Sequence, residues 1–513
     1  MRKAYINAKL FNQPNDAFIV ENGRFIRFGR KGSILNTHVD EVIDLAGHHV
    51  LPGFNDSHLH VLGIGKSMNM ENLAHYKTIN DLIEGLKKSA KTPLIGRGYH
   101  ESQFLDKRSP TKVDLNQISA NKIIILYRVC GHMVVANDYA INLAKKQGTL
   151  PEDPDAYDLS TGIFKEDAIA WIMQVASTIT DAAIEAEILK AQDYLLSHGI
   201  TAVGSDDFAM YKIPFERILN VFKKLDDDHR LKLRVLEQAN IPSIGEFQRF
   251  IDQGLVRKRF NRYHMGPLKL LADGSLGARS AYMREPYEDA DTKGIRVFKP
   301  DVIKRLITMA NDAGMDVAIH AIGDQMIEEL LDIFESIPEE ARLNRRHSII
   351  HAQLARPDQI ERMRDLKIGA QTQPIFINSD LAILEKSLGK TRMENSYLFN
   401  TMAKQDVVTT ISTDAPVEDV NPFENLHVAI TRQSIKNPEL GVYLKEEGFS
   451  YRDAIKAYTE VPAYFFYQED ELGKLKKDYY ADFIIVKDLS QKDLLKAEVL
   501  ETYIEGERVY AKK

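Results

Sequence analysis

The sequence is poor in cysteine, and this scarcity narrows the classes of protein that it can encode. A single cysteine, Cys130, stands among 513 residues, so no disulfide can form within the chain. Small secreted scaffolds depend on several such bonds, and a reducing compartment is therefore the simplest location. We expect a cytoplasmic protein.

Long hydrophobic runs and an excess of positive charge are also missing. The longest apolar stretches, such as residues 123–126, are far shorter than the roughly 18 residues that cross a bilayer. The basic residues Arg2 and Lys3 are followed by no apolar segment of the kind found in signal peptides. Lys and Arg number 67 against 74 Asp and Glu, which gives a net charge of −7. This balance offers no electrostatic reason to expect a nucleic acid or a membrane as partner.

The rest of the composition is that of a large folded protein. Hydrophobic residues make up 44% and charged residues 27% of the chain, which is enough to bury a sizeable core. At about 100–200 residues per domain, the length allows several domains or one large barrel with appendages. The composition names no substrate.

Both ends of the chain have the pattern of short β-strands. Residues 1–50 contain strand-like runs with a turn at Asn22-Gly23, and residues 468–513 contain further runs of this kind. Neither piece is large enough to bury a core alone. We expect the two ends to pair into one small β-sandwich domain made of residues 1–50 and 468–513.

Between these ends, residues 51–467 alternate short apolar runs with longer amphipathic stretches, which predicts βα units around a parallel sheet. The eight apolar runs are residues 50–60, 199–207, 231–240, 266–275, 315–324, 347–353, 366–374 and 407–416. From the second run onward, the intervening stretches have room for a helix and its loops. The sequence therefore predicts an α/β fold with a (β/α)8 TIM-like barrel.

The long gap after the first of these runs predicts an insertion at about residues 62–175. It contains two further strand-like runs, residues 93–99 and 122–129, and a polar loop at residues 147–162. Barrels build their active sites on the side where this insertion begins. We expect it to act as a lid and to hold determinants of substrate choice.

Four histidines and one aspartate fall at the C-terminal ends of the predicted barrel strands. His58 and His60 end the first strand, His320 the fifth, His351 the sixth and Asp414 the eighth. Residues i and i+2 of a strand face the same side, so His58 and His60 can reach one ion. An isolated pair of this kind is readily explained by packing, but five such residues at strand ends are not. Imidazoles with a carboxylate suit Zn²⁺ or a similar divalent metal.

These residues lie in motifs that resemble the amidohydrolase superfamily. The strings LPGFNDSHLH, HAIGD, IIHAQ and STDAP occur in this order on the predicted strands. Further runs, GHMVVAN, KLLADGSLGARSAYM, AQTQP and NPFENLHVAITRQ, resemble its YtcJ-like, amidohydrolase 3 branch, to which N-substituted formamide deformylase belongs. The resemblance covers nearly the whole chain, and its motifs say little about the substrate.

The resemblance implies a role for each of these side chains. His58 and His60 would bind the more buried metal, His320 and His351 would complete the metal site, and Asp414 would bind metal and move protons. Many members of the superfamily bridge two metals through a carboxylated lysine at the end of the fourth strand. We expect one or two divalent ions per chain, most simply zinc, with manganese, iron or nickel as alternatives.

The fourth predicted strand holds Lys269, which lies between two leucines in an apolar run. A charged ammonium is costly to bury there. Burial beside a metal would lower the pKa of Lys269 and leave a neutral amine that can take up CO₂. The alternatives are a salt bridge to Asp273, four residues further along the strand, and a site with a single metal.

Other polar residues are weaker candidates. His351, where not fully committed to metal, and His132 in the insertion are candidates for stabilising an oxyanion, although His132 also suits a plain turn. Arg279, in a Gly-rich loop after the fourth strand, could grip a carboxylate or carbonyl group of a substrate. Glu101 and Tyr99 could line a substrate pocket, although such residues are more often found at a rim or on a helix face.

The combined prediction is a metal-dependent hydrolase that cleaves the C–N bond of an amide, formamide or cyclic amide in a small molecule. Metal would lower the pKa of a bound water, and Asp414 would act as general acid and base. Three alternatives remain: an esterase or phosphoesterase on the same fold, a metal-dependent isomerase or lyase, and a non-catalytic barrel that binds a ligand. A homodimer is possible, and no sequence feature decides it.

Overall fold

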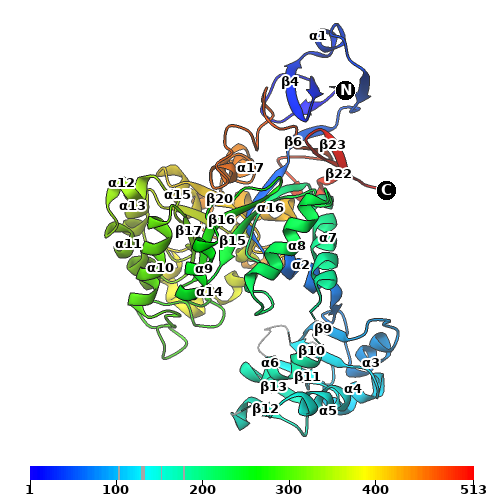
Figure 1. Ribbon diagram of the computed structural model, residues 1–513, viewed down its shortest axis with the longest axis vertical. Coiled ribbons are helices and arrows are strands. Elements are labelled where there is room, and N and C mark those ends of the chain that lie inside the picture. The colour runs from blue at the N-terminus through cyan, green and yellow to red at the C-terminus, as the bar shows by residue number, and fades with distance from the viewer. Residues whose placement is uncertain (102–103, 129–132, 152, 177–178) are drawn as a thin grey trace. The chain divides into compact units, whose positions relative to one another are not determined.

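The computed structural model of the protein describes residues 1–101, 104–128, 133–151, 153–176 and 179–513. The chain forms two compact units. The larger unit comprises Met1–Ile64 and Ile188–Lys513, and the smaller unit comprises Gly65–Glu187. Figure 1 shows the elements of both. No helix among these residues combines the length and the apolar character that spanning a membrane requires.

An eight-stranded parallel sheet lies at the centre of the larger unit. Its strands, in the order in which they pair, are β7 (Phe54–Leu59), β14 (Ile200–Ser205), β15 (Arg234–Asn240), β16 (Tyr263–Leu271), β17 (Val317–Ala321), β18 (Ser348–His351), β19 (Gly369–Thr372) and β20 (Thr409–Ile411). Seven of the eight lie within one of the predicted apolar runs, and β16 begins three residues before its run at 266–275, so the prediction of an α/β barrel is confirmed.

The barrel closes just beyond the C-terminal ends of its first and last strands. The backbone N–H of Asp414 donates to the carbonyl of His58 at 2.9 Å, and the N–H of His60 donates to the carbonyl of Ala415 at 2.9 Å. Closure therefore occurs at the residues that the sequence predicts to bind metal.

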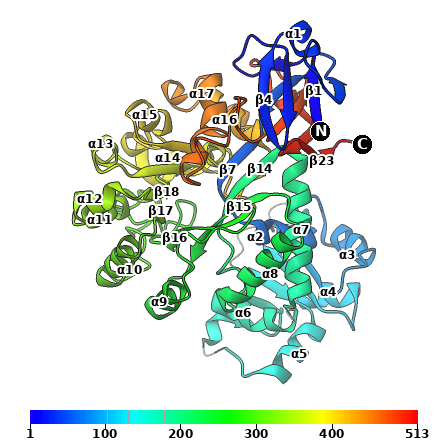
Figure 2. The same ribbon diagram turned by 45° about the horizontal axis from the view of Figure 1, so that its top comes forward.

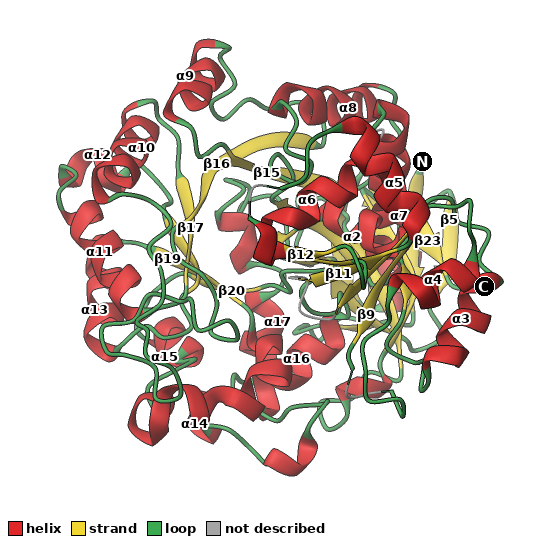
Figure 3. Cartoon of the chain, turned by 90° about the horizontal axis from the view of Figure 1, so that it is seen from below, coloured by secondary structure: helices red, strands yellow, loops and turns green. Residues whose placement is uncertain are grey.

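Burial explains why these segments form strands and helices. Every residue of β7 and β14 is buried, as expected for parallel strands that are covered on both faces. The helices between strands bury one face only, which in α8 carries Ile218, Phe222 and Leu225 at spacings of three and four residues. In Figure 3, α9, α10, α11 and α13 lie outside β16, β17 and β19.

The helices of the larger unit that follow barrel strands are α8 (Phe215–Asp227), α9 (Ile244–Asp252), α10 (Pro300–Asp312), α11 (Asp324–Glu335), α12 (Glu339–Leu343), α13 (Pro357–Leu366), α14 (Ile377–Met393), α15 (Phe399–Lys404), α16 (Pro422–Thr431) and α17 (Tyr451–Ala457). Helices α2 (Val61–Asn69) and α7 (Asp181–Ser197) contain the junctions with the smaller unit.

The two ends of the chain form two small sheets beside each other (Figure 2). One sheet contains β1 (Arg2–Ile6), β3 (Ala17–Glu21), β4 (Arg24–Gly29) and β5 (Glu41–Asp44), and the other contains β2 (Lys9–Leu10), β6 (His49–Pro52), β21 (Phe483–Lys487), β22 (Glu498–Ile504) and β23 (Glu507–Ala511). A short helix, α1 (Lys31–Leu35), follows β4.

Aromatic side chains from both ends of the chain share one core between these sheets. Tyr5 stacks on Phe18 with ring centroids 4.8 Å apart, and Phe483 stacks on Tyr503 at 4.4 Å. The sheets belong to the same compact unit as the barrel. The domain limits 1–50 plus 468–513 and 51–467 stay predictions.

The smaller unit is an α/β unit with a core on each face of its sheet. The strands, in pairing order, are β12 (Tyr157–Asp158), β13 (Ile163–Lys165), β11 (Met133–Ala136), β10 (Ile124–Arg128), β9 (Leu94–Tyr99) and β8 (Glu71–Asn72), and the helices are α3 (Ile79–Lys87), α4 (Lys112–Ile118), α5 (Asp138–Gln147) and α6 (Asp167–Met173). Ile124 and Leu126 of β10 enter one core while Ile125 enters the other, as the two-residue period of a strand requires. Its role as a lid stays a prediction.

Candidate metal centre

Barrel closure brings His58, His60 and Asp414 together. The Nε2 atoms of His58 and His60 lie 3.3 Å and 3.0 Å from Oδ1 of Asp414. The ligand atoms that the three side chains offer all lie within 4.8 Å of one another. Donors bound to one zinc ion at about 2.0–2.2 Å lie at comparable separations from each other. Two imidazoles and a carboxylate in this arrangement fit a divalent metal ion.

His320 and His351 lie next to this group. Their rings are 4.4 Å apart between centroids, and the ring of His351 is 5.9 Å from that of His58. They reach this position from β17 and β18, which are adjacent strands. The structure therefore gathers all five of the residues that the sequence places at strand ends.

Lys269 also belongs to this group. Its Nζ lies 3.4 Å from Nε2 of His58 and 3.9 Å from a carboxylate oxygen of Asp206, and its side chain is 2% exposed. Burial lowers the pKa of Lys269, although the charges of Asp206 and Asp414 oppose this shift. Lys269 is thus held where a neutral amine is favoured.

The alternative of a Lys269–Asp273 salt bridge is wrong. Strand β16 ends at Leu271, so Asp273 lies beyond the strand and no longer shares the face of Lys269. The carboxylate of Asp273 instead accepts hydrogen bonds from the backbone N–H groups of Tyr282, Ile322 and Gly323. The acidic neighbour of Lys269 is Asp206, at the end of β14.

Hydrogen bonds to the second ring nitrogen orient three of the histidines. Nδ1 of His58 lies 2.6 Å from Oε1 of Gln238, and Nδ1 of His351 lies 2.7 Å from Oε1 of Gln373. Nδ1 of His60 lies 2.7 Å from the carbonyl oxygen of Asp206. Because these oxygens accept, Nδ1 of each ring carries a proton, and Nε2 is the nitrogen that would face a metal.

Sequence reasoning missed Gln238, Gln373 and Asp206. Each stands in or directly after the end of a barrel strand, which is the position that singled out the histidines. The same positional rule, extended from histidine to amide and acidic side chains, could have found them.

Three of the four histidines and Asp414 have the charge state that binds a cation. Burial lowers the pKa of His58, of His351 and of His320, whose pKa falls to about 4. Burial acts in the same direction on His60, but its hydrogen bond to Asp414 and the charge of Asp206 outweigh it and raise its pKa to about 9. Despite burial, the hydrogen bonds from His58 and His60 hold the pKa of Asp414 well below its usual value. Neutral imidazoles and an ionised carboxylate are the forms that bind metal, so His60 would release a proton when a metal binds.

The backbone is strained at the same residues. His351 has a φ of 74° and Asp414 a φ of 55°, in the left-handed region that residues other than glycine seldom adopt. A hydrogen bond from the backbone N–H of Thr413 to Asp56, at 3.1 Å, holds the chain just before Asp414. Such strain is retained mainly at functional sites, which agrees with the convergence of side chains here.

Arg279 has its charged group engaged by other protein atoms. Its Nε and one terminal nitrogen each lie 2.7 Å from the carboxylate of Asp289, and the other terminal nitrogen donates to the carbonyl of Leu276. Its role in substrate binding stays a prediction.

The candidates in the smaller unit have structural partners there. Glu101 forms a two-point ion pair with Arg128 at 3.0 Å and 2.8 Å, and these hydrogen bonds lower the pKa of Glu101 to about 2. Tyr99 is fully buried in one of the cores. His132 lies outside the described residues. A substrate role for any of the three stays a prediction.

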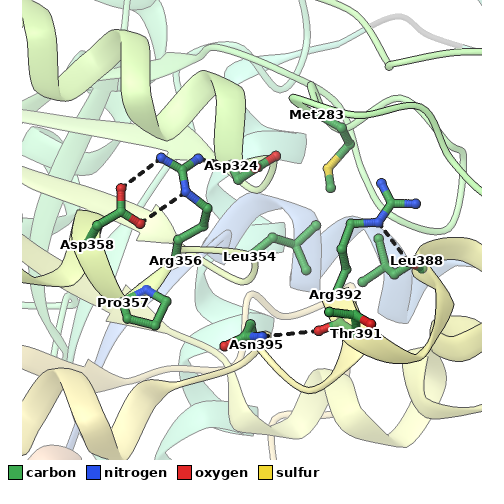
Figure 4. Close-up of a pocket in the computed structure, with 10 residues that line it drawn as sticks. All are labelled: Met283, Asp324, Leu354, Arg356, Pro357, Asp358, Leu388, Thr391, Arg392 and Asn395. Carbon is green, nitrogen blue, oxygen red and sulfur yellow. Dashed lines mark hydrogen bonds and ion pairs between the residues drawn. The ribbon is translucent and has the colours of Figure 1, made fainter.

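A cavity of about 290 Å³ opens between the loop after β18 and the second half of α14 (Figure 4). Its walls combine apolar side chains, among them Leu354 and Leu388, with Arg356 and Arg392. Figure 4 shows the guanidinium of Arg356 turned toward Asp358 and Asp324. None of the residues of the metal centre is among its described lining residues, so this cavity is separate from that centre.

Comparisons with known proteins agree with this geometry. YtcJ of Bacillus subtilis (strain 168) is 29% identical over 521 residues, which span 97% of this chain and 95% of that protein. N-substituted formamide deformylase of Arthrobacter pascens is 22% identical, over 96% of this chain and 95% of that protein. The crystal structure of an uncharacterized metal-dependent hydrolase from Pyrococcus furiosus is 31% identical, covers 97% of this chain and 100% of that chain, and superposes with a TM-score of 0.81.

The family model described as "Amidohydrolase family" matches residues 41–510, which include every barrel strand and all the side chains gathered at the metal centre. The region of sequence similarity to the family therefore contains the whole candidate site. This chain is a hydrolase that belongs to the amidohydrolase family.

Proposed function

We propose that this hydrolase cleaves a C–N bond, other than a peptide bond, in a small amide, formamide or cyclic amide. The observation that carries the proposal is the contact of one carboxylate oxygen of Asp414 with both His58 and His60. A carboxylate in this position can take a proton from water and deliver it to a leaving nitrogen. The similarity to N-substituted formamide deformylase supports a C–N bond as the target.

His58, His60, His320, His351 and Asp414 would hold the metal, with zinc as the first choice. When bound, a divalent ion supplies Lewis acidity and lowers the pKa of water. The residues of the chain supply the remaining parts. Gln238 and Gln373 would orient imidazoles, and Asp414 would move protons. A role for His351 in stabilising the oxyanion stays a prediction, because its Nδ1 proton is directed at Gln373.

We further propose that Lys269 is carboxylated. Its neutral amine would add to CO₂ with release of one proton and would become an anionic carbamate that can bridge two ions. The burial of Lys269 and its contact with His58 support this step. Measurement of intact mass under non-acidic conditions should show one added CO₂, and Lys269→Ala should abolish it.

Replacement of Asp414 with Asn tests the proton-transfer role. We expect turnover to fall by roughly 10²–10⁴-fold, because the amide cannot accept the proton, while most of the metal stays bound. Turnover would be measured on a panel of N-formyl, N-acyl and cyclic amides with Zn²⁺ or Mn²⁺, and metal content by atomic emission.

Asp312→Asn, an equal change of charge at an exposed position of α10, is the matched control and should keep full activity. Unchanged turnover in Asp414→Asn would contradict the assignment. If the enzyme cleaves esters or phosphoesters and none of the amides, the alternative of an esterase or phosphoesterase would replace the proposed C–N hydrolase.

A further inference from the structure

Asp380 carries a carboxylate group close to the metal centre that the proposed mechanism does not use. The ring of Phe376 stacks on His351, with centroids 5.8 Å apart and ring planes 22° from parallel. Helix α14 starts directly after Phe376, and Asp380 follows four residues later. Residues at i and i+4 lie on the same helix face, one turn of about 5.4 Å apart. Asp380 is therefore one helical turn from a residue that touches His351.

A second connection from the metal centre reaches the same carboxylate. Gln353, two residues after His351, donates from Nε2 to Oδ2 of Asp380 at 3.0 Å. The hydroxyl of Tyr397 donates to the same oxygen at 2.5 Å. Gln353 is 1% exposed and Tyr397 is fully buried, so both donors are held by the surrounding protein. Together they fix the orientation of the carboxylate.

The other oxygen of Asp380 is not engaged by the described residues. Across the part of the chain that the structure describes, Oδ1 of Asp380 has no hydrogen-bond partner and the carboxylate has no ion-pair partner. Asp380 keeps partial contact with solvent, in contrast to its two donors. One oxygen is thus anchored from within the protein, and the other is available from outside.

The charged groups around Asp380 do not neutralise it. Arg279 lies near enough to act on it but is paired with Asp289, and Glu418, a further acid, is paired with Lys436. Burial and the charge of Glu418 raise the pKa of Asp380, against the hydrogen bonds from Tyr397 and Gln353 and the charge of Arg279. A cationic ligand would therefore gain a charge-assisted hydrogen bond here.

We propose that Asp380 binds a protonated amine of the substrate, so that the preferred amides carry an ammonium group near the scissile bond. The inference rests on the proposed function and names its substrate class. An ammonium group offers three donors and a positive charge to the available oxygen, whereas a neutral chain leaves that oxygen unpaired and a carboxylate is repelled.

Matched pairs of substrates test the proposal. N-formyl and N-acyl derivatives of short diamines are compared with analogues in which a methyl group replaces the distal amine. We expect the wild type to favour the amine member by roughly 10-fold or more in kcat/KM, the size of a hydrogen bond to a charged group. Equal kcat/KM values for the two members would overturn the proposal, whatever the behaviour of any variant.

Replacement of Asp380 with Asn tests the residue itself. The variant should raise KM about 10-fold for the amine member, leave kcat within about twofold, and leave the methyl member unchanged. Glu385→Gln, an equal charge change at an exposed position of the same helix, is the matched control and should keep the preference. An Asp380→Asn variant that keeps the wild-type preference would contradict the assignment.

The binding of free diamines, measured by calorimetry with and without metal, tests the inference about Asp380 independently of the proposed hydrolysis. Binding to the wild type that is about 10-fold weaker in Asp380→Asn supports the inference even if no amide is cleaved. Cleavage of both members with no amine binding overturns the inference and leaves the proposed function standing.

Discussion

At the scale of single residues, amide side chains hold the buried histidines of the metal centre. Gln238 accepts from His58 and also donates to the backbone carbonyl of Ser57 at 2.9 Å and to Gln371 at 3.0 Å. Its orientation is therefore fixed, with the amide oxygen toward His58. A carboxylate in this place would add negative charge to the imidazole, and a neutral amide does not.

Replacement of Gln238 with Ala should weaken metal binding. We expect a loss of roughly 10–100-fold in affinity, because His58 would no longer be held in one tautomer and orientation. Competition with a chromophoric chelator measures the affinity directly, without turnover. Gln248→Ala, at an exposed position of α9, is the control. Equal affinity of the two variants would show that Gln238 is not needed for positioning.

The sequence predicts the residues that converge at the candidate metal centre better than the residues that support them. Histidine at a strand end is informative because few residue types bind metal and few positions face the barrel opening. Gln238 shares the strand-end position but not a residue type that indicates metal, and Asp380 lies on a helix, so their roles depend on which side chains the closed barrel brings opposite them. The Lys269–Asp273 pairing failed for a related reason, because the end of β16 at Leu271 is not visible in the alternation of the sequence.

At the scale of elements, a neutral histidine joins the starts of two barrel strands. Nδ1 of His347, directly before β18, accepts a hydrogen bond from the backbone N–H of Val317 in β17 at 3.1 Å. Burial, together with the charges of Arg345 and Arg342, lowers the pKa of His347 to about 3. Protonation would remove this acceptor and place a charge in the core.

The stability of the protein should therefore fall with pH in a defined window. Because the pKa of His347 is lower in the folded chain than its usual value of about 6.5, the unfolded chain binds the proton first. The stabilisation of the folded chain by neutral His347 is complete above about pH 6.5. It is lost as the pH falls toward 3, by on the order of 1.4 kcal/mol per pH unit.

His347→Gln should flatten this dependence, because Gln offers an acceptor that does not titrate. Urea unfolding between pH 6.5 and 4.5 measures the free energy of unfolding, and the wild type should lose about 2–3 kcal/mol more than the variant. His229→Gln, at an exposed position, is the control. Parallel pH profiles for the wild type and His347→Gln would contradict the prediction.

At the scale of the whole molecule, a buried ion pair fastens the C-terminal strands to the barrel. Arg234, the first residue of β15, lies 2.8 Å from Asp482 and 2.7 Å from Glu505, and its side chain is 7% exposed. Asp482 precedes β21 and Glu505 follows β22. One guanidinium thus connects a barrel strand with two points of the terminal sheet.

Replacement of Arg234 with Met should destabilise the larger unit by about 3–5 kcal/mol, because Asp482 would stay buried without a counter-charge. Urea unfolding followed by far-UV circular dichroism measures the loss in the free energy of unfolding. Arg249→Met removes an exposed pair with Glu216 and should cost at most about 1 kcal/mol. Equal losses of stability in the two variants would show that the buried ion pair stabilises the protein no more than an exposed one.

The barrel follows closely from the sequence because its eight apolar runs coincide with its strands. The smaller unit does not, since β12 and β13 arise within and after the polar segment 147–162, which carries little hydrophobic pattern. Strand β13 pairs with β11 and with β12, so its pairing with β11 gives both short strands a place in the sheet, and that pairing is a long-range property.

Gly65, where the chain enters the smaller unit, approaches the backbone of Glu187, where the chain leaves it. A Cβ atom at Gly65 would lie 2.2 Å from the carbonyl oxygen of Glu187, so no other residue fits without a shift of the backbone. The entry and exit of a segment of more than a hundred residues thus meet at one point. Closely spaced ends are the geometry that the insertion of a domain requires, because the chain can leave the barrel and return to it at one place.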